Sequence, residues 1–176
     1  MRAVVAEADC LYDQRAVEQA LDSMAEQIRD RLEGSNPLVL CVMTGALIPA
    51  GHLLTRLDFP LELDYCHATR YANTTRGGSL QWKARPSLDL AGRTVLVFDD
   101  ILDEGLTLAA ILEHCREAGA REVLSAVLVN KHHDRKCDLS PDFVGLDVGD
   151  RYVFGYGMDY RGYLRNLPGI YAVKGL

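Results

Sequence analysis

The stretch "VLVFDDILDEGLTLAAI", Val95 to Ile111, joins an apolar run to a cluster of acids. Two aspartates follow the apolar residues directly, and Asp103, Glu104 and Gly105 come before an apolar helical pattern. One carboxylate at the start of a helix serves as a cap, and capping does not require four acids. The acids therefore indicate a binding site at the turn between a strand and a helix.

The chemistry of such a turn suits a phosphorylated sugar. Backbone N–H groups at a glycine-containing helix start bind phosphate. Two adjacent carboxylates beside them can hold Mg²⁺ or vicinal hydroxyls. The sequence contains no GxxxxGK motif, so the turn is not a Walker loop. These features together predict a site for a phosphorylated ribose.

The composition narrows the class of protein. The 176 residues suffice for one domain with a substantial core, and the net charge of −6 comes without a Lys/Arg block, so we expect no nucleic-acid partner. The five cysteines are scattered and lack CxxC spacing, which favours a reducing compartment over disulfides or a zinc site. No apolar run approaches 18 residues and no signal-peptide core is present, so we predict a cytoplasmic protein without a membrane partner.

Strand and helix patterns alternate along the chain, which predicts an α/β fold with a mostly parallel sheet. Ligands bind beyond the carboxyl ends of the strands in such sheets, where residues 99–107 fall. The last 35 or so residues differ, because short apolar runs alternate with turns, and they predict a small lobe over the sheet edge. The expected helices are 13–33, one from about Pro49, and 106–118; the expected strands are 37–43, 61–71, 80–85, 93–98 and 122–129.

The opening stretch resembles the phosphoribosyl-pyrophosphate signature of type I phosphoribosyltransferases. "VMTGALIPAGHLL" resembles their pyrophosphate loop, and Asp142 to Pro168 is similar to the C-terminal segment of hypoxanthine–guanine phosphoribosyltransferases. Together the matches span roughly residues 38–173. The resemblance implies the type I phosphoribosyltransferase fold: a mostly parallel twisted sheet flanked by helices, with a small hood lobe. It implies one domain, 1–176, in which residues 142–176 contribute the purine-binding flap.

The resemblance also implies roles on the ribose-phosphate side. Asp99 and Asp100 would face the ribose hydroxyls and the metal, and Asp103 would lie near purine N7 as a general base or acid. The pyrophosphate loop would contain a non-proline cis peptide at Met43–Thr44. Thr44, Gly45 and Arg165 would contact the pyrophosphate. The turn of Glu104, Gly105, Leu106 and Thr107 would bind the 5′-phosphate. Tyr71 would lie at the base of a flexible loop that closes over the reaction, next to Arg70.

On the purine side, Lys131 would donate a hydrogen bond to the exocyclic O6. A lysine there favours 6-oxopurines, because adenine presents an amino donor instead. Tyr152 would stack on the base, Val153 would contact its edge through the main chain, and Asp159 would serve as a second metal ligand. The cofactor implied is Mg²⁺, bound by Asp99, Asp100 and Asp159.

The chain departs from the family pattern at three positions. Relatives often have Lys at the position of Thr44, Thr at that of Glu104, and Lys or Arg at that of Leu106. Arg70 could replace the charge absent from Thr44. A carboxylate at position 104 should repel a phosphate unless its side chain turns outward, whereas the backbone donors do not depend on residue type.

We expect a purine salvage enzyme that makes IMP and GMP from hypoxanthine and guanine, assembled as a homodimer or homotetramer. A xanthine-preferring enzyme is the alternative within the family. A nucleotide-binding regulator of the same fold, or a degenerate binding module, is the alternative outside enzymes. We expect no metal site at His132, His133 and Asp134, because adjacent side chains rarely point at one ion. Cys41 and Cys66 lie in apolar strand patterns and are expected to be buried and inert.

Overall fold

The computed structural model describes residues 1–70 and 80–175, which form a six-stranded sheet, flanking helices and a small second sheet. The strand order of the large sheet is β4-β3-β2-β5-β6-β7. All neighbouring pairs are parallel except β3–β4, which is antiparallel at one edge. The strands are β2 Leu38–Val42, β3 Glu62–Arg70, β4 Leu80–Ala84, β5 Thr94–Leu102, β6 Glu122–Lys131 and β7 Phe143–Val148.

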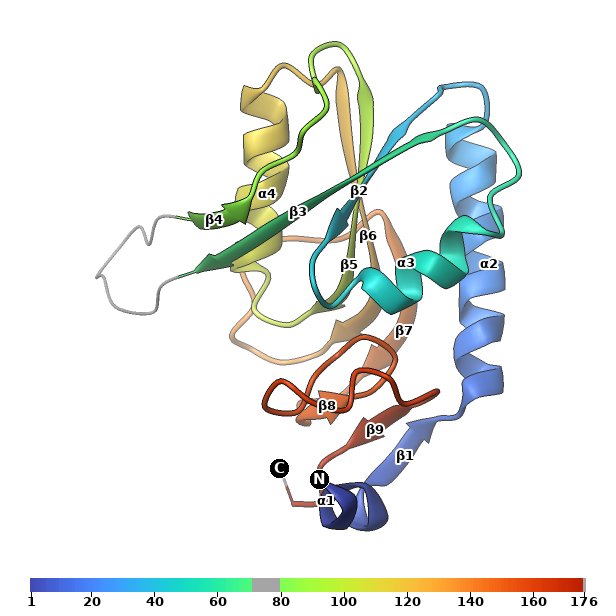
Figure 1. Cartoon of the computed structure of the whole chain (residues 1–176), viewed down its shortest axis with the longest axis vertical. Coiled ribbons are helices and arrows are strands. Elements are labelled where there is room, and N and C mark those ends of the chain that lie inside the picture. The colour runs from blue at the N-terminus through green and yellow to red at the C-terminus, as the bar shows by residue number, and fades with distance from the viewer. Residues whose placement is uncertain (71–79, 176) are drawn as a thin grey trace.

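Helices cover both faces of this sheet (Figure 1). The helices α2 (Gln14–Leu32) and α3 (Leu47–Leu54) pack on one face, and α4 (Leu106–Glu117) packs on the other. Successive side chains of a strand point to opposite faces, so β5 directs Leu96 and Phe98 to the first core and Val95 and Val97 to the second. Burial on both faces explains why the central strands are continuous apolar runs.

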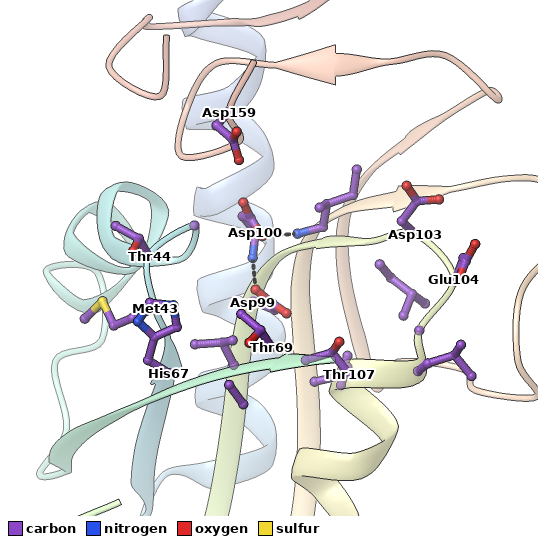
Figure 2. Close-up of a pocket in the computed structure, with 18 of the residues that line it drawn as sticks. Met43, Thr44, His67, Thr69, Asp99, Asp100, Asp103, Glu104, Thr107 and Asp159 are labelled. Atoms are coloured by element: carbon purple, nitrogen blue, oxygen red, sulfur yellow. Dashed lines mark hydrogen bonds between the residues drawn. The ribbon is translucent and has the colours of Figure 1, made fainter. Parts of the chain in front are cut away.

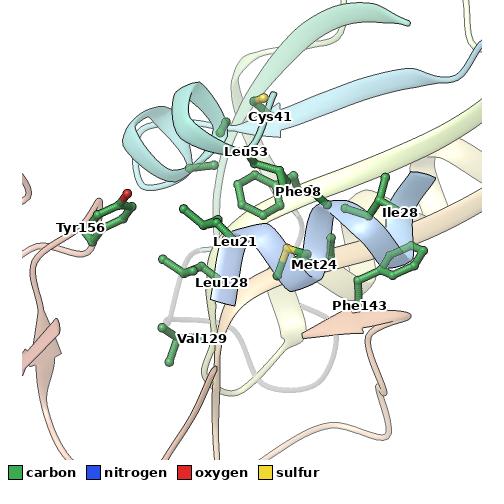
Figure 3. Packing of buried hydrophobic residues seen from close by; sticks show 14 of the residues in the cluster. Leu21, Met24, Ile28, Cys41, Leu53, Phe98, Leu128, Val129, Phe143 and Tyr156 are labelled. Atoms are coloured by element: carbon green, nitrogen blue, oxygen red, sulfur yellow. The ribbon is translucent and has the colours of Figure 1, made fainter. Parts of the chain in front are cut away.

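The α2 helix follows the predicted pattern closely. Asp13 caps its N-terminus by accepting a hydrogen bond from the Ala16 N–H at 2.8 Å. Its apolar stripe faces Phe98, Leu128 and Phe143 (Figure 3). The buried residues of the stripe are Val17, Leu21, Met24, Ala25, Ile28 and Leu32.

The small sheet joins both ends of the chain. Its order is β1-β9-β8, formed by Asp9–Tyr12, Ile170–Ala172 and Val153–Phe154, with antiparallel pairs throughout. A short helix, α1 (Arg2–Glu7), precedes β1. The two termini therefore lie close together (Figure 1). We call this unit, residues 1–12 and 149–175, the lobe.

Two sequence-based expectations about the C-terminal part and β5 need correction. Residues 143–148 were expected in the lobe, but they form β7, which pairs in parallel with β6 and extends the large sheet. β5 was expected to end at Phe98, but it continues through both aspartates to Leu102, with Leu102 opposite Asn130. Pairing with the longer β6 keeps this segment extended, which local sequence could not reveal.

Other expectations are confirmed. Pro49 lies in the first turn of α3, and Cys41 and Cys66 are buried. Burial raises the pKa of the Cys41 thiol to about 11 and that of Cys66 to about 12. Within the part of the chain that the structure describes, no helix is long and apolar enough to cross a membrane.

Candidate active site

Two adjoining cavities open at the carboxyl ends of the parallel strands. The larger, of about 540 Å³, lies between the loop after β2, the end of β3 and the β5–α4 turn. The smaller, of about 210 Å³, lies between β5, β6 and the lobe. Both are lined by Asp100, Ile101, Asp103 and Asp159, so they form one cleft.

The acidic pair lies at the floor of the larger cavity (Figure 2). Asp99 Oδ1 accepts a hydrogen bond from the Asp100 N–H at 2.9 Å, and Asp100 Oδ1 accepts one from the Ile101 N–H at 2.9 Å. Burial raises the pKa of the Asp99 carboxyl well above its usual range, and the adjacent Asp100 raises it further. Burial also raises the pKa of Asp100, although Arg165 partly opposes this. Such a pair favours a cation beside it.

Glycine at position 45 allows the loop after β2 to approach this pair. A Cβ on Gly45 would lie 2.0 Å from Asp100 Oδ2, far inside van der Waals contact. The peptide bond between Met43 and Thr44 is cis, as the family resemblance implied. The absence of a side chain at Gly45 leaves the loop backbone directly against the Asp100 carboxylate.

The turn before α4 presents backbone donors to the same cavity. Gly105 has φ +83, a left-handed conformation that glycine adopts without strain, and it forms the N-cap of α4. The first N–H groups of a helix have no partner within the helix, so those at Leu106 and Thr107 are available to a ligand. Glu104, in the same turn, is solvent-exposed at the edge of the cavity. This geometry suits an anion at the helix start.

Asp103 lies where the two cavities meet and contacts two nitrogen groups. Its Oδ2 lies 3.2 Å from Lys131 Nζ, and its Oδ1 lies 2.6 Å from His133 Nε2. Lys131 Nζ also lies 3.7 Å from Asp150 Oδ1. Lys131 ends β6, so the parallel pairing of β5 with β6 brings it beside Asp103 across a gap of 28 residues.

The lobe closes the other side of the cleft. Arg165 Nη2 lies 2.7 Å from Asp159 Oδ1, and Nη1 lies 3.8 Å from Asp100 Oδ2. Figure 2 shows Asp159 facing Asp100 from the lobe. Gly157 has φ +109, and a Cβ there would lie 2.2 Å from the Gly45 carbonyl oxygen, so lobe and loop meet backbone to backbone. On the far side of the lobe, the buried Tyr156 donates a hydrogen bond to Glu18 Oε1 on α2 at 2.6 Å.

All but two of the residues that the sequence singled out line this cleft. Tyr71 lies outside the described residues, and of Arg70 only the backbone is described, at the end of β3. Those lining the larger cavity are Thr44, Gly45, Asp99, Asp100, Asp103, Glu104, Gly105, Leu106, Thr107, Asp159 and Arg165; those lining the smaller are Asp100, Asp103, Lys131, Tyr152, Val153 and Asp159.

Sequence reasoning missed several residues of the cleft. His67 and Thr69 line the larger cavity from β3, and Met158 lines the smaller one from the lobe. Burial lowers the pKa of His67, and the positive charges of Lys83 and Arg165 lower it further. The alternation of β3 could have signalled His67 and Thr69, because both lie on the same face of the strand near its carboxyl end. His133 lines neither cavity but contacts Asp103 from behind, and no local signal marked that contact.

Comparison with known proteins places this cleft in a family. Residues 7–161 match the phosphoribosyl transferase domain. The chain is 34% identical over 165 residues to a hypoxanthine-guanine-xanthine phosphoribosyltransferase of Tritrichomonas foetus, covering 93% of this chain and 90% of the relative. It is 32% identical over 165 residues to a hypoxanthine-guanine phosphoribosyltransferase of Bacillus subtilis, covering 93% and 92%.

Solved structures agree with this placement. A hypoxanthine-guanine-xanthine phosphoribosyltransferase superposes with a TM-score of 0.86 at 32% identity, covering 94% of this chain and 96% of that one. A hypoxanthine-guanine phosphoribosyltransferase of Bacillus anthracis superposes with a TM-score of 0.88 at 29% identity, covering 94% and 98%. Fold, cleft and relatives thus agree: the chain belongs to the phosphoribosyltransferase family and, within it, groups with the hypoxanthine-guanine phosphoribosyltransferases.

Proposed function

We propose that the protein transfers the 5-phosphoribosyl group of phosphoribosyl pyrophosphate to N9 of hypoxanthine or guanine, giving IMP or GMP and pyrophosphate. The observation that carries the proposal is Asp103, which lines both cavities and contacts Lys131. A turn suited to a sugar phosphate and a cavity suited to a base thus meet at one titratable side chain.

The larger cavity would hold the ribose and its phosphates. The N–H groups at Gly105 to Thr107 would bind the 5′-phosphate, and Thr44, Gly45 and Arg165 would contact the pyrophosphate, with the guanidinium offering paired donors. Arg70 would replace the charge absent from Thr44, and Tyr71 would belong to the base of the loop over the reaction.

The smaller cavity would hold the purine. Lys131 Nζ would leave the carboxylates it contacts here and donate to O6, while Tyr152 stacks on the ring and Val153 contacts its edge through the main chain. Adenine would be rejected, because its amino group leaves the buried lysine without an acceptor.

The reaction would form the N9–C1′ bond and break the bond from C1′ to pyrophosphate. The proton that the purine loses would pass from N7 to Asp103, a transfer worth about 10²–10⁴ in rate. The ribose ring carries positive charge in the transition state, and the carboxylates of Asp99 and Asp100, which would face the ribose hydroxyls, would stabilise that charge.

The cleft suits the Mg²⁺ ion that we infer as cofactor. Within residues 1–70 and 80–175, no three His, Cys, Asp or Glu side chains form a metal-binding cluster by themselves. Mg²⁺ in proteins commonly takes one or two carboxylates and completes its shell with substrate oxygens and water. Asp99, Asp100 and Asp159 would supply these carboxylates, one or two to an ion, with the substrate and water completing the shell, and the charge of Mg²⁺ would offset that of the departing pyrophosphate. Asp159→Ala should raise the Mg²⁺ concentration needed for half-maximal turnover, and an unaltered Mg²⁺ titration would contradict the assignment.

Two further features of the protein belong to this proposal. Leu47, Leu63 and Tyr65 are 54%, 55% and 51% exposed around an apolar groove, which fits burial against a second copy in a homodimer or homotetramer. Light scattering tests this, and a monomer at micromolar concentration would contradict it.

The unpaired cysteines fit a protein of the cytoplasm, where thiols stay reduced, and cell fractionation tests this location.

The central test is a spectrophotometric assay with phosphoribosyl pyrophosphate and Mg²⁺, run separately with hypoxanthine, guanine, xanthine and adenine. Turnover of hypoxanthine or guanine but not adenine is expected. Turnover of xanthine alone would retain the mechanism and change the specificity. Xanthine is the main competitor, because it appears in the names of the Tritrichomonas foetus relative and of a similar solved structure. No turnover with any base would contradict the proposal.

A further inference from the structure

The imidazole of His133 lies directly behind Asp103 and has no role in the reaction described so far. Its side chain is 2% exposed, and its Nε2 lies 2.6 Å from Asp103 Oδ1. Its Nδ1 lies 3.0 Å from the backbone nitrogen of Arg135. The ring is therefore held at both nitrogens, between a backbone turn and the acid where the two cavities meet.

The backbone contact determines which nitrogen carries the proton. The Arg135 N–H can only donate, so Nδ1 must accept with its lone pair and carries no hydrogen. The single ring proton is then on Nε2, which donates to Asp103 Oδ1. In this arrangement His133 is a neutral donor, and it leaves the negative charge of the carboxylate in place.

The two oxygens of Asp103 are held by groups of different mobility. Lys131, which contacts Oδ2 at 3.2 Å, ends in a flexible chain and is shared with Asp150. His133, which contacts Oδ1, is a buried ring with two rotatable bonds. When Lys131 turns to a base, Oδ1 stays bound and Oδ2 is left free to face it.

The neighbouring histidine shows that this contact is specific. His132 lies on the other side of the chain, 2.6 Å from Asp147, and its side chain is 63% exposed. The two rings therefore contact different carboxylates.

We propose that His133 is a positioning residue for the reaction. By donating from Nε2 to Oδ1 it fixes the plane of the Asp103 carboxylate, so that Oδ2 is aligned with the purine N7 in the transition state. The inference rests on the proposed function, because it assigns Asp103 to proton transfer. A misaligned catalytic group can lower the rate by about 10²-fold without weakening substrate binding.

The test compares two substitutions at this position. His133→Leu keeps apolar volume and removes the donor, and we expect kcat to fall about 10- to 100-fold with the KM values for base and phosphoribosyl pyrophosphate unchanged. His133→Gln places an amide donor near the position of Nε2, and kcat should stay within about 3-fold of wild type. His132→Leu is the matched control and should leave kcat unchanged. Thermal unfolding checks that each variant is folded.

A double-mutant cycle asks whether His133 acts through Asp103. In an Asp103→Asn background, His133→Leu should add little further loss, because the group that it positions is already disabled. Losses that multiply in the double variant would overturn the proposal, as would equal kcat values for His133→Leu and wild type. Equal losses for the Leu and Gln variants would also overturn it, because they would show that packing of the ring matters and not its donor.

A spectroscopic readout separates this inference from the function itself. Long-range ¹H–¹⁵N spectra of the wild-type protein should show His133 as the tautomer protonated at Nε2, whatever the activity. Protonation at Nδ1 would overturn the positioning role even in an active enzyme. An inactive wild-type protein with the expected tautomer would instead indicate that the proposed function has failed.

Discussion

The larger cavity takes most of its lining from one unbroken stretch, residues 99–108, whereas the smaller cavity is lined by residues from three separate parts of the chain: the end of β5 with its following turn, β6, and the lobe. In the first, strand, acidic pair and helix start follow one another along the chain. In the second, Lys131 and Tyr152 meet only because β6 and the lobe are brought beside β5. A contiguous stretch can therefore be identified from sequence, and a site assembled from distant segments depends on the fold for every contact.

Asp103 belongs to both cavities, so its substitution should have the largest effect. Asp103→Asn keeps the shape but cannot accept the proton, and we expect kcat to fall about 10²–10⁴-fold while phosphoribosyl pyrophosphate binds nearly as before. Steady-state kinetics and a binding titration measure both. Asp138→Asn, an exposed residue that lines neither cavity, is the control. An unchanged turnover number would remove the proton-transfer role.

Substitution of Gly45 should damage the larger cavity most, because Gly45 lines that cavity and not the smaller one. In Gly45→Ala the new Cβ would lie 2.0 Å from Asp100 Oδ2, so the carboxylate or the loop must shift. Overpacking of this kind costs about 1–3 kcal/mol, and we expect phosphoribosyl pyrophosphate to bind about 10- to 100-fold more weakly. Calorimetric titration measures the loss. Gly51→Ala, with open space around its Cβ, should bind normally, and equal affinities for the two variants would contradict this account.

Removal of Lys131 should affect the smaller cavity alone. A hydrogen bond to a charged group contributes about 1.5–3 kcal/mol, so Lys131→Ala should raise the KM for the purine about 10- to 100-fold. The affinity for phosphoribosyl pyrophosphate, measured without base, should change little. Lys174→Ala removes the same charge from a residue that lines neither cavity. A parallel loss of both affinities would mean that the two cavities do not bind independently.

The attachment of the lobe should depend on Tyr156, and substitution of this residue should have the smallest effect on function. Tyr156→Phe removes the donor to Glu18, and we expect unfolding to require about 1–3 kcal/mol less free energy, seen as a lower Tm. Burial by itself raises the pKa of Glu18, but hydrogen bonds from Tyr156 and Arg56 lower it overall.

This lowered pKa sets the pH dependence of the Tyr156→Phe effect. A carboxyl group with a lower pKa in the folded state stabilises the protein above the unfolded pKa, near 4.5, and loses that contribution as the pH falls through the folded value. The difference in Tm between wild type and Tyr156→Phe should therefore be largest near neutral pH and shrink below about pH 4.5. A difference that grows with acid would contradict the ionised Glu18 contact.

Individual helices and strands show how much of the fold the sequence could predict. Periodicity predicted α2 to within a residue at each end, because its buried stripe recurs at steps of three and four. It did not predict β1, a four-residue strand that is stable only because β9 pairs with it from the other end of the chain. β7 looked like part of the lobe, because its partner β6 lies across a turn-rich connection.

The sequence by itself determined the α/β class, the acidic strand-to-helix turn and its suitability for a phosphorylated ribose, because strand, acids and glycine follow one another in the chain. Family resemblance added Lys131 and the lobe residues of the cleft. Only the tertiary structure decided that β5 runs through the acidic pair, that Gly45 lies against Asp100, and that His133 lies against Asp103. These contacts join residues that are far apart in sequence. They depend on how the parallel strands pair and on how the lobe docks, and no local sequence pattern encodes either.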